Sequence, residues 1–453
     1  MKTFHFSALY WKKSWIRNAR VTVDEKGIIQ SIEKNIPGGE GYFIPGFNNC
    51  HSHCFQFAMA GISEFSTEGN LNDSFWSWRD TMYRLAQKID SSTLLAIAKQ
   101  LFSTMLANGY TSVVEFHYLH HQGSGLPYEK STELALVLSE AAEATGIQLT
   151  LVPVFYNKGG FQEEIKKGQK RFFMKNLEDY QEYVSQLQSQ ALGKFKVGHG
   201  LHSLRAADIE DAKVLLSSSM SNGPIHLHIS EQIKEVEEFK KLYGKRPVQW
   251  ILEEFDDTKP LNLVHSTHID HNETIELAKS KHCVVICPST EANLGDGIFP
   301  LKEFEKLGGT WSIGSDSHIK VNPFQELELL DYGQRLATQS RNPLLHGSNL
   351  NTGDLLFRKS QEGSEISSHY SGFLDIGSCL TGVKIDEHHP HLLSKGIDHI
   401  LSTSIFCFEN DLISAVYVKG NKVAENGRHV NYVEIKEEYR DSIQNLLSNG
   451  LNS

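Results

Sequence analysis

The sequence lacks the features that mark secreted and membrane-spanning proteins. Its 453 residues include only six cysteines, too few for a disulfide framework in a chain of this length. No uninterrupted apolar run approaches the roughly 18 to 20 residues that a membrane span needs. The opening residues, MKTFHFSALYWKKSW, lack the apolar core of a signal peptide. These absences predict a reduced, cytoplasmic protein that does not cross a membrane.

Positive charge is also in short supply. Lys and Arg number 44 against 55 Asp and Glu, which gives a formal net charge of −11. This balance argues against nucleic acids and anionic membrane surfaces as partners and favours a small soluble one. With 40% hydrophobic and 22% charged residues, the chain has a globular composition, so disordered and fibrous classes are excluded.

From about Tyr42 onward, short β-rich apolar runs alternate with helical patterns. Eight strands are predicted, at residues 42–47, 111–116, 148–155, 195–201, 224–229, 261–266, 283–288 and 310–313. A capping box of Asp270 and Glu273 predicts the start of a helix over 271–279. Eight such βα units in about 300 residues predict an α/β fold of the (β/α)8 TIM-barrel type, over residues 44–372.

The two ends of the chain have a different pattern. Residues 1–43 contain two alternating strands around a Glu-Lys-Gly turn, and residues 373–435 contain a hairpin pair with turns at Gly420-Asn421 and Asn426-Gly427. Neither piece could stand alone, so we expect one small β-sandwich domain built from both chain termini and packed beside the barrel. Residues 436–453 are predicted to form a C-terminal helix or tail.

Histidine is abundant, with 22 residues, and several lie at predicted strand ends. His51 and His53 are two apart, so their side chains share one face. His226 and His228 lie on the fifth strand, with Glu231 three residues on; His265 and His268 close the sixth, and Asp316 and His318 the eighth. Because the strand ends of a βα barrel meet at one face, we expect these groups to converge.

Three neutral imidazoles and one carboxylate suit one divalent metal ion, Zn²⁺ above all. Either His226 or His228 would complete the set. Thiolate ligation by Cys50 and Cys54 is the rival reading, but their side chains face away from those of His51 and His53. Such an ion makes hydroxide available at neutral pH, so the pattern predicts metal-assisted hydrolysis with Glu231 as the proton carrier.

Longer strings of residues resemble a known family. HSH after the first strand, His on the fifth and sixth, and Asp on the eighth resemble the amidohydrolase superfamily. The strings NDSFWSWRDTMYRL, VVEFHYLHH, LHSLRA, HLHISEQ, STEANLGDGIFP, GSDSH and YGQRL resemble more closely its formimidoylglutamate deiminases, the N-formimidoyl-L-glutamate iminohydrolases of histidine degradation. They span nearly the whole barrel.

The resemblance implies hydrolytic deimination of N-formimidoyl-L-glutamate to N-formyl-L-glutamate and ammonia, by a homodimer. No lysine stands in GHGLHSLR where binuclear relatives carry one, so one metal ion is expected. The metal ligands carried over are His51, His53, His228 and Asp316, and the catalytic groups are Glu231, His265 and Asp316. The substrate-binding residues carried over are Gln56, Arg79, Tyr118, His202 and Arg205. Two arginines suit a small dicarboxylate amidine, since guanidinium groups bind carboxylates bidentately.

Two alternatives remain open at this point. A deaminase of a purine or pyrimidine-type ring amidine, such as guanine, would use the same metal site. A flat ring, however, is better bound by aromatic stacking and by hydrogen bonds from amide side chains than by two arginines. A catalytically dead binding protein on the same barrel is disfavoured by the intact ligand set. We expect His120 and His121 in a loop, and His388, His389 and His391 on the solvated surface.

Overall fold

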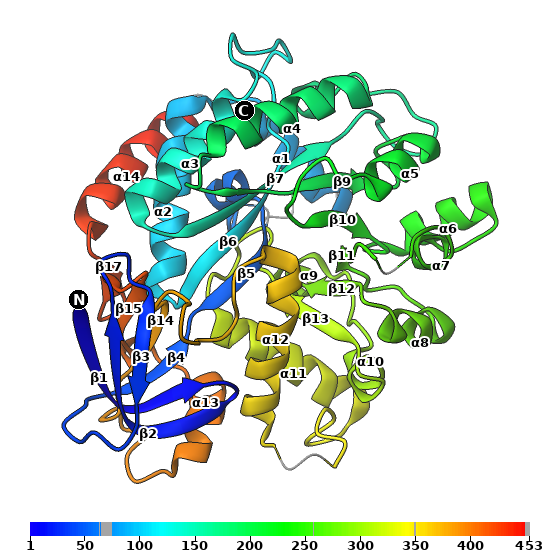
Figure 1. The fold of residues 1–453 in the computed structure, drawn as a ribbon. Coiled ribbons are helices and arrows are strands. Elements are labelled where there is room, and N and C mark those ends of the chain that lie inside the picture. Colours follow the sequence, from blue (N-terminus) through cyan, green and yellow to red (C-terminus); the bar gives the residue numbers. More distant parts are fainter. Residues whose placement is uncertain (63, 65–74, 257, 348–349, 449–453) are drawn as a thin grey trace.

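The computed structural model describes residues 1–62, 64, 75–256, 258–347 and 350–448. Within it, eight parallel strands form a nearly closed barrel (Figure 1), as the sequence predicted. In chain order the barrel strands are β5 (Phe47–Ser52), β6 (Tyr110–His117), β7 (Gln148–Phe155), β9 (His199–Ser203), β10 (Ile225–Ile229), β11 (Leu261–His265), β12 (Cys283–Ile286) and β13 (Thr310–Ile313). A short β8 (Lys196–Val197) pairs with β7.

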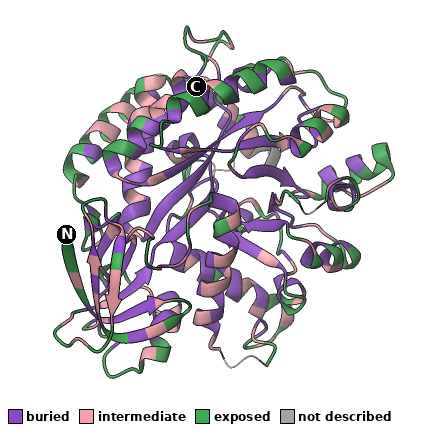
Figure 2. Ribbon diagram, viewed as in Figure 1, coloured by how far each residue is buried: buried purple, intermediate pink, exposed green. Residues whose placement is uncertain are grey.

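The barrel strands are buried on both faces (Figure 2), which is the pattern of parallel strands covered by helices. The helices that follow one another along the chain are α1 (Phe75–Ala86), α2 (Ser91–Ala107), α3 (Glu133–Thr145), α4 (Leu177–Ala191), α5 (Ile209–Ser217), α6 (Ile233–Tyr243), α7 (Pro247–Glu254), α8 (His271–Lys279), α9 (Pro288–Leu294), α10 (Leu301–Lys306), α11 (Pro323–Thr338) and α12 (Thr352–Ser368). Short 3-10 helices are η1 (Cys54–Met59), η2 (Lys167–Phe172), η3 (Ile397–His399) and η4 (Asn410–Leu412).

The predicted helix start at Asp270 is confirmed. Its side chain accepts a hydrogen bond from the backbone N–H of Glu273, and the Glu273 side chain accepts one from the backbone N–H of Asp270. This reciprocal pair satisfies two amide groups that the first helical turn leaves without partners.

The first and last barrel strands meet at their carboxyl ends. The backbone N–H of Asp316 donates to the carbonyl oxygen of His51 at 3.0 Å, and the N–H of His53 donates to that of Asp316 at 3.1 Å. Gly314 allows this approach, because a Cβ atom there would lie 2.7 Å from Cβ of His51. Closure of the barrel therefore brings Asp316 next to the His51–His53 pair.

A second, largely antiparallel sheet combines both ends of the chain (Figure 1). Its strands, in spatial order, are β17 (Arg428–His429), β16 (Asn421–Glu425), β15 (Ile413–Val418), β14 (Gly382–Ile385), β4 (Tyr42–Pro45), β1 (Lys2–Trp11), β2 (Ser14–Val23) and β3 (Ile29–Glu33). Two further helices lie in the C-terminal part of the chain: α13 (Ile400–Phe406), which contacts α12 and α11, and α14 (Tyr432–Ser448), which contacts α2. The predicted separate β unit built from the two termini is confirmed.

One strand prediction is wrong in its extent. Residues 42–47 do not form the first barrel strand, since β4 pairs with β1 and β14 of the terminal sheet, and the barrel strand β5 begins at Phe47. The break falls at Gly46, where a Cβ atom would lie 2.2 Å from the side chain of Thr111. The continuous apolar pattern hid this change of sheet. Among the described helices, none is long and apolar enough to cross a bilayer.

Candidate metal and substrate site

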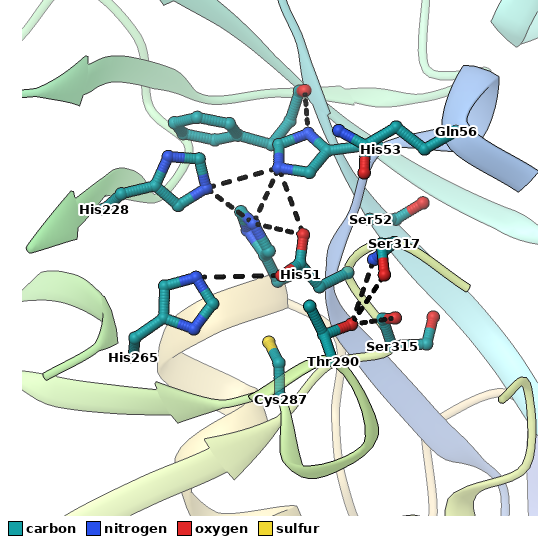
Figure 3. A network of polar contacts seen from close by, with 12 residues as sticks. His51, Ser52, His53, Gln56, His228, His265, Cys287, Thr290, Ser315 and Ser317 are labelled. Atoms are coloured by element: carbon teal, nitrogen blue, oxygen red, sulfur yellow. Dashed lines mark hydrogen bonds and ion pairs between the residues drawn. The ribbon is translucent and has the colours of Figure 1, made fainter. Parts of the chain in front are cut away.

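Three imidazole nitrogens converge at the carboxyl ends of β5 and β10 (Figure 3). The Nε2 atoms of His51 and His53 lie 3.1 Å apart, those of His53 and His228 3.2 Å, and those of His228 and His51 2.9 Å. Asp316 closes the group, with Oδ1 at 3.6 Å from Nε2 of His51 and 3.3 Å from Nε2 of His53. The structure thus brings together all four predicted ligands.

The protonation of these rings suits metal binding. The Nδ1 of His53 faces the carbonyl oxygen of Phe116 at 3.1 Å, which fixes the proton on Nδ1 and leaves the Nε2 lone pair facing the other rings. Burial lowers the pKa of His53 to about 3 and holds the pKa values of His51 and His228 well below the usual range. All three rings are therefore neutral near pH 7.

The donor set fits a zinc ion. Zn–N bonds of about 2.0–2.1 Å place the nitrogens of a tetrahedral site about 3.3 Å apart, close to the spacing of the three Nε2 atoms. Without a cation, buried lone pairs that face one another at this distance repel. No lysine lies at the end of β9, where the chain reads His199–Ser203, so the residues present fit a single ion.

Asp316 and His265 both lie in a backbone region that side chains rarely adopt. Their φ angles are +47° and +70°, and such conformations concentrate where function requires them. The Asp316 loop is held by Thr290, whose Oγ1 contacts the carbonyl oxygen of Ser315 at 3.2 Å and Oγ of Ser317 at 3.0 Å. The residues on either side of Asp316 are therefore held in place.

His265 lies beside the four converging groups and is surrounded by carboxylates. Its Nε2 is 3.7 Å from Oε1 of Glu231 and 3.7 Å from Oδ2 of Asp316, and its Nδ1 is 3.2 Å from Oε1 of Glu291. Burial opposes a charge on the ring, but the carboxylates outweigh it and raise the pKa of His265 to about 10. Burial raises the pKa of Asp316 to about 7.

A cavity of about 300 Å³ opens above these groups. All of the predicted substrate residues line it, namely Gln56, Arg79, Tyr118, His202 and Arg205. Nη2 of Arg205 lies 3.4 Å from Oε2 of Glu231 and 3.9 Å from Oε2 of Glu235. Gln56 donates to the Tyr118 hydroxyl at 2.9 Å, and the His202 ring packs 5.0 Å from that of His228.

Sequence reasoning missed several groups at this site. Glu291 belongs to the STEANLGDGIFP string but had no role in the sequence analysis, and its buried carboxylate contacts His265. The sulfur of Cys287 lies within 4.8 Å of ligand atoms of His265 and Asp316. Burial holds the pKa of the Cys287 thiol well above its usual value, and a protonated thiol is a poor metal ligand.

Other predicted groups lie away from the converging imidazoles. Nε2 of His226 is 2.8 Å from the carbonyl oxygen of Ser367, so His228 is the member of that pair that faces the site. The cysteines beside His51 and His53 are not in its ligand group. His318 contacts Ser315 and Ser52 at 2.9 and 3.2 Å. Residues 72–74 of the NDSFWSWRDTMYRL string lie outside the described residues.

One surface prediction is wrong. His389 is only 2% exposed, and its ring faces the carboxylates of Glu409 and Asp411. Its Nε2 lies 3.5 and 3.3 Å from their carboxylates, and its Nδ1 accepts the backbone N–H of His391 at 3.3 Å. Because Nδ1 accepts this hydrogen bond, the ring proton is on Nε2. The Nε2–H group therefore faces the carboxylates of Glu409 and Asp411. His120 and His121 lie in a loop, as expected, but are also hydrogen-bonded, to the carbonyl oxygens of Val154 and Phe173.

Comparisons with known proteins agree with this architecture. The model of the amidohydrolase family matches residues 42–354. A formimidoylglutamate deiminase from Pseudomonas aeruginosa is 38% identical over 426 residues, which cover 92% of this chain and 93% of the relative. A 5-methylthioadenosine/S-adenosylhomocysteine deaminase from Pyrococcus furiosus is 24% identical over 91% of this chain and 92% of its own length.

Solved structures give the same result. The crystal structure of an amidohydrolase from Brucella melitensis has a TM-score of 0.91 and 33% identity, and covers 99% of this chain and 100% of its own. An adenosine deaminase from Xanthomonas campestris with bound zinc has a TM-score of 0.80 at 15% identity, covers 98% of each chain, and shows likeness of fold alone. The predicted resemblance is confirmed: the chain belongs to the amidohydrolase family.

Proposed function

We propose that this protein hydrolyses N-formimidoyl-L-glutamate to N-formyl-L-glutamate and ammonia, a step of histidine degradation. One observation carries the proposal: a single cavity has converging imidazoles and an aspartate at its base and two arginines in its walls. The base suits metal-assisted hydrolysis, and the arginines suit a substrate with two carboxylates. The relative from Pseudomonas aeruginosa bears the name of this activity.

His51, His53, His228 and Asp316 would hold one zinc ion. When bound, such an ion lowers the pKa of water toward 7 and supplies a nucleophile at neutral pH. Zinc is named in the Xanthomonas campestris structure and in that of an atrazine chlorohydrolase from Arthrobacter aurescens, both of this fold.

The carboxylate of Glu231 is placed to carry the proton. It lies 3.7 Å from Nε2 of His265 and 3.4 Å from Arg205, at the boundary between the imidazoles and the arginine wall. Glu231 takes one proton from water as oxygen adds to the formimidoyl carbon and gives it to the imino nitrogen. It then takes the remaining hydroxyl proton as the C=O bond forms and gives it to the same nitrogen, whose C–N bond breaks to release ammonia. His265 and Asp316 orient the nucleophile and stabilise the charge that develops.

Arg79 and Arg205 would bind the two carboxylates. Burial opposes the charge of Arg205, but Glu235 and Glu231 outweigh it and raise the pKa of the guanidinium above its usual value. The side chain therefore stays cationic inside the cavity. Its neighbouring carboxylates also hold the guanidinium in one place, which reduces the entropy lost when a substrate binds.

The test is ammonia release by zinc-loaded protein with N-formimidoyl-L-glutamate or guanine as substrate. We expect release from the linear dicarboxylate and none from the ring amidine. Release from guanine alone would replace the proposal with a ring deaminase, and release from neither substrate would reject both.

We also propose a homodimer in the cytoplasm. Four of the six cysteines are buried thiols and none is paired with another, which suits a reducing compartment. The dimer is a prediction from the family resemblance, and sedimentation of the purified protein tests it.

A further inference from the structure

Three side chains outside the predicted site form a connected group on the cavity wall. Tyr83 lies on α1, Tyr156 directly follows β7, and Gln169 lies in η2. Nε2 of Gln169 donates to the Tyr156 hydroxyl at 2.8 Å and approaches the Tyr83 hydroxyl at 3.3 Å. Both tyrosines line the cavity, and Gln169 is fully buried behind them.

The orientation of the Gln169 amide is fixed by its other contacts. Its Oε1 accepts the backbone N–H of Lys166 at 2.9 Å, and its Nε2 also lies 3.1 Å from the carbonyl oxygen of Gly159. A flipped amide would place an NH₂ group against an N–H donor and an oxygen against a carbonyl. Of the two Nε2 hydrogens, one is directed to the Gly159 carbonyl and the other to the tyrosine oxygens, of which that of Tyr156 is the nearer.

This direction has a consequence for the tyrosine hydrogens. Gln169 presents only hydrogens to the two hydroxyl oxygens, so neither O–H can donate to it. Within the part of the chain that the structure describes, the hydrogen-bond contacts of both hydroxyls are those with Gln169, in which the tyrosine oxygen is the acceptor. A hydroxyl that lines the cavity with its hydrogen uncommitted is a donor for an anionic group.

The surroundings of the pair favour a carboxylate. The guanidinium carbon of Arg79 lies 5.6 Å from the ring centre of Tyr83, and Arg79 and Arg205 line the same cavity as the two tyrosines. Glu231 and Glu235 already offset the charge of Arg205. A neutral hydroxyl adds a hydrogen bond to a substrate carboxylate without adding charge beside these groups.

We propose that Tyr83 and Tyr156 bind one carboxylate of the substrate together with the arginines, and that Gln169 is the positioning residue that directs their hydroxyls. This inference rests on the proposed function and deepens it. It adds to the two arginines a tyrosine pair: Tyr83 belongs to the NDSFWSWRDTMYRL string but had no role there, and Tyr156 belongs to none of the quoted strings.

The experiment is isothermal titration of N-formyl-L-glutamate, the proposed product, into zinc-loaded full-length protein. Wild type, Tyr83→Phe and Tyr156→Phe are compared, and Tyr183→Phe is the matched control, since Tyr183 is a buried tyrosine of α4 that does not line the cavity. Each cavity variant keeps its ring and loses only the hydroxyl. Loss of a hydrogen bond to a charged group should raise Kd about 10-fold or more, and the control should match wild type.

Gln169→Leu tests the positioning role. We expect it to raise Kd as the Tyr83→Phe/Tyr156→Phe double variant does, with little further effect when all three changes are combined. N-formylglycine, which has one carboxylate, is titrated for comparison. If Gln169 has a purely structural role, Gln169→Leu should instead lower Tm and raise the Kd for N-formylglycine by the same factor. The tyrosine variants keep the test decisive if Gln169→Leu fails to fold.

The outcomes separate the two proposals. If wild type binds N-formyl-L-glutamate and both tyrosine variants bind it equally well, the tyrosine assignment is overturned and the proposed function stands. If wild type releases ammonia from N-formimidoyl-L-glutamate but does not bind the dicarboxylate product, the tyrosine assignment is overturned; if it does neither, the proposed function is overturned and this inference with it.

Discussion

The Nδ1 atom of His265 lies 3.2 Å from the Oε1 atom of Glu291, and both side chains are buried. The same oxygen accepts the backbone N–H of Cys287 at 2.9 Å. An ionised carboxylate only accepts hydrogen bonds, so the proton of His265 at this position is on Nδ1, and Nε2 faces Glu231 and Asp316. Glu291 thereby sets the orientation of the ring next to the proposed metal ligands.

Glu291→Leu should lower kcat by about 10- to 100-fold, the usual effect of losing such an orienting partner. Glu291→Gln retains an oxygen that can accept from both donors, so it should recover most of the activity. Metal content by mass spectrometry should be the same in both variants. Equal kcat values for the Leu and Gln variants would show that Glu291 does not act by orienting His265.

Replacement of Glu231 tests the proton carrier. Glu231→Gln keeps the shape of the side chain but removes its ability to take up a proton, so turnover should fall by about 100-fold or more. Zinc content should persist, because Glu231 is not among the four proposed ligands. Near-normal ammonia release by this variant would remove Glu231 from the mechanism.

Arg205→Lys tests carboxylate binding while keeping the charge beside Glu231 and Glu235. Lysine cannot form the bidentate contact, so KM for N-formimidoyl-L-glutamate should rise about 10-fold with a smaller change in kcat. Arg20→Lys is the control, because Arg20 pairs with Glu33 in the terminal sheet. An unchanged KM in Arg205→Lys would count against the arginine as a carboxylate ligand.

Gly314→Ala tests the closure of the barrel as the source of the ligand geometry. The new methyl group would lie 2.7 Å from Cβ of His51, so His51 must move and zinc affinity should fall, about 10-fold or more for a displaced ligand. Gly333→Ala is the matched control, since the nearest atoms lie 4.0 Å away in Ile298. We expect equilibrium dialysis to separate the two variants, and equal zinc binding would contradict the role given to Gly314.

Much of the fold could be predicted because its signals are local. Alternating apolar runs and helix caps such as Asp270 with Glu273 follow from neighbouring residues, and H-x-H spacing places two side chains on one face. The change of sheet at Gly46 could not be predicted, since the apolar run YFIPGF at 42–47 continues across it. Only the strands that pair with Tyr42–Pro45 and with Phe47–Ser52 show the change.

At the site, sequence reasoning found the histidine and carboxylate side chains that lie at the ends of predicted barrel strands. It missed Glu291, Tyr83 and Gln169, because each acts through a contact with a residue distant in the chain and each is an ordinary helix or loop residue by itself. His389 was predicted to lie on the surface because its local sequence is polar. That sequence does not indicate that Glu409 and Asp411, which are distant in the chain, lie beside its ring.

The central claim is tested most directly by NMR of N-formimidoyl-L-glutamate incubated with wild-type protein, before chelation, after chelation and after zinc is restored. The account predicts N-formyl-L-glutamate and ammonia in equal amounts, loss of both on chelation, recovery with zinc, and no recovery in His228→Ala. No N-formyl-L-glutamate from the zinc-loaded wild type, or formation that persists in His228→Ala, would contradict it.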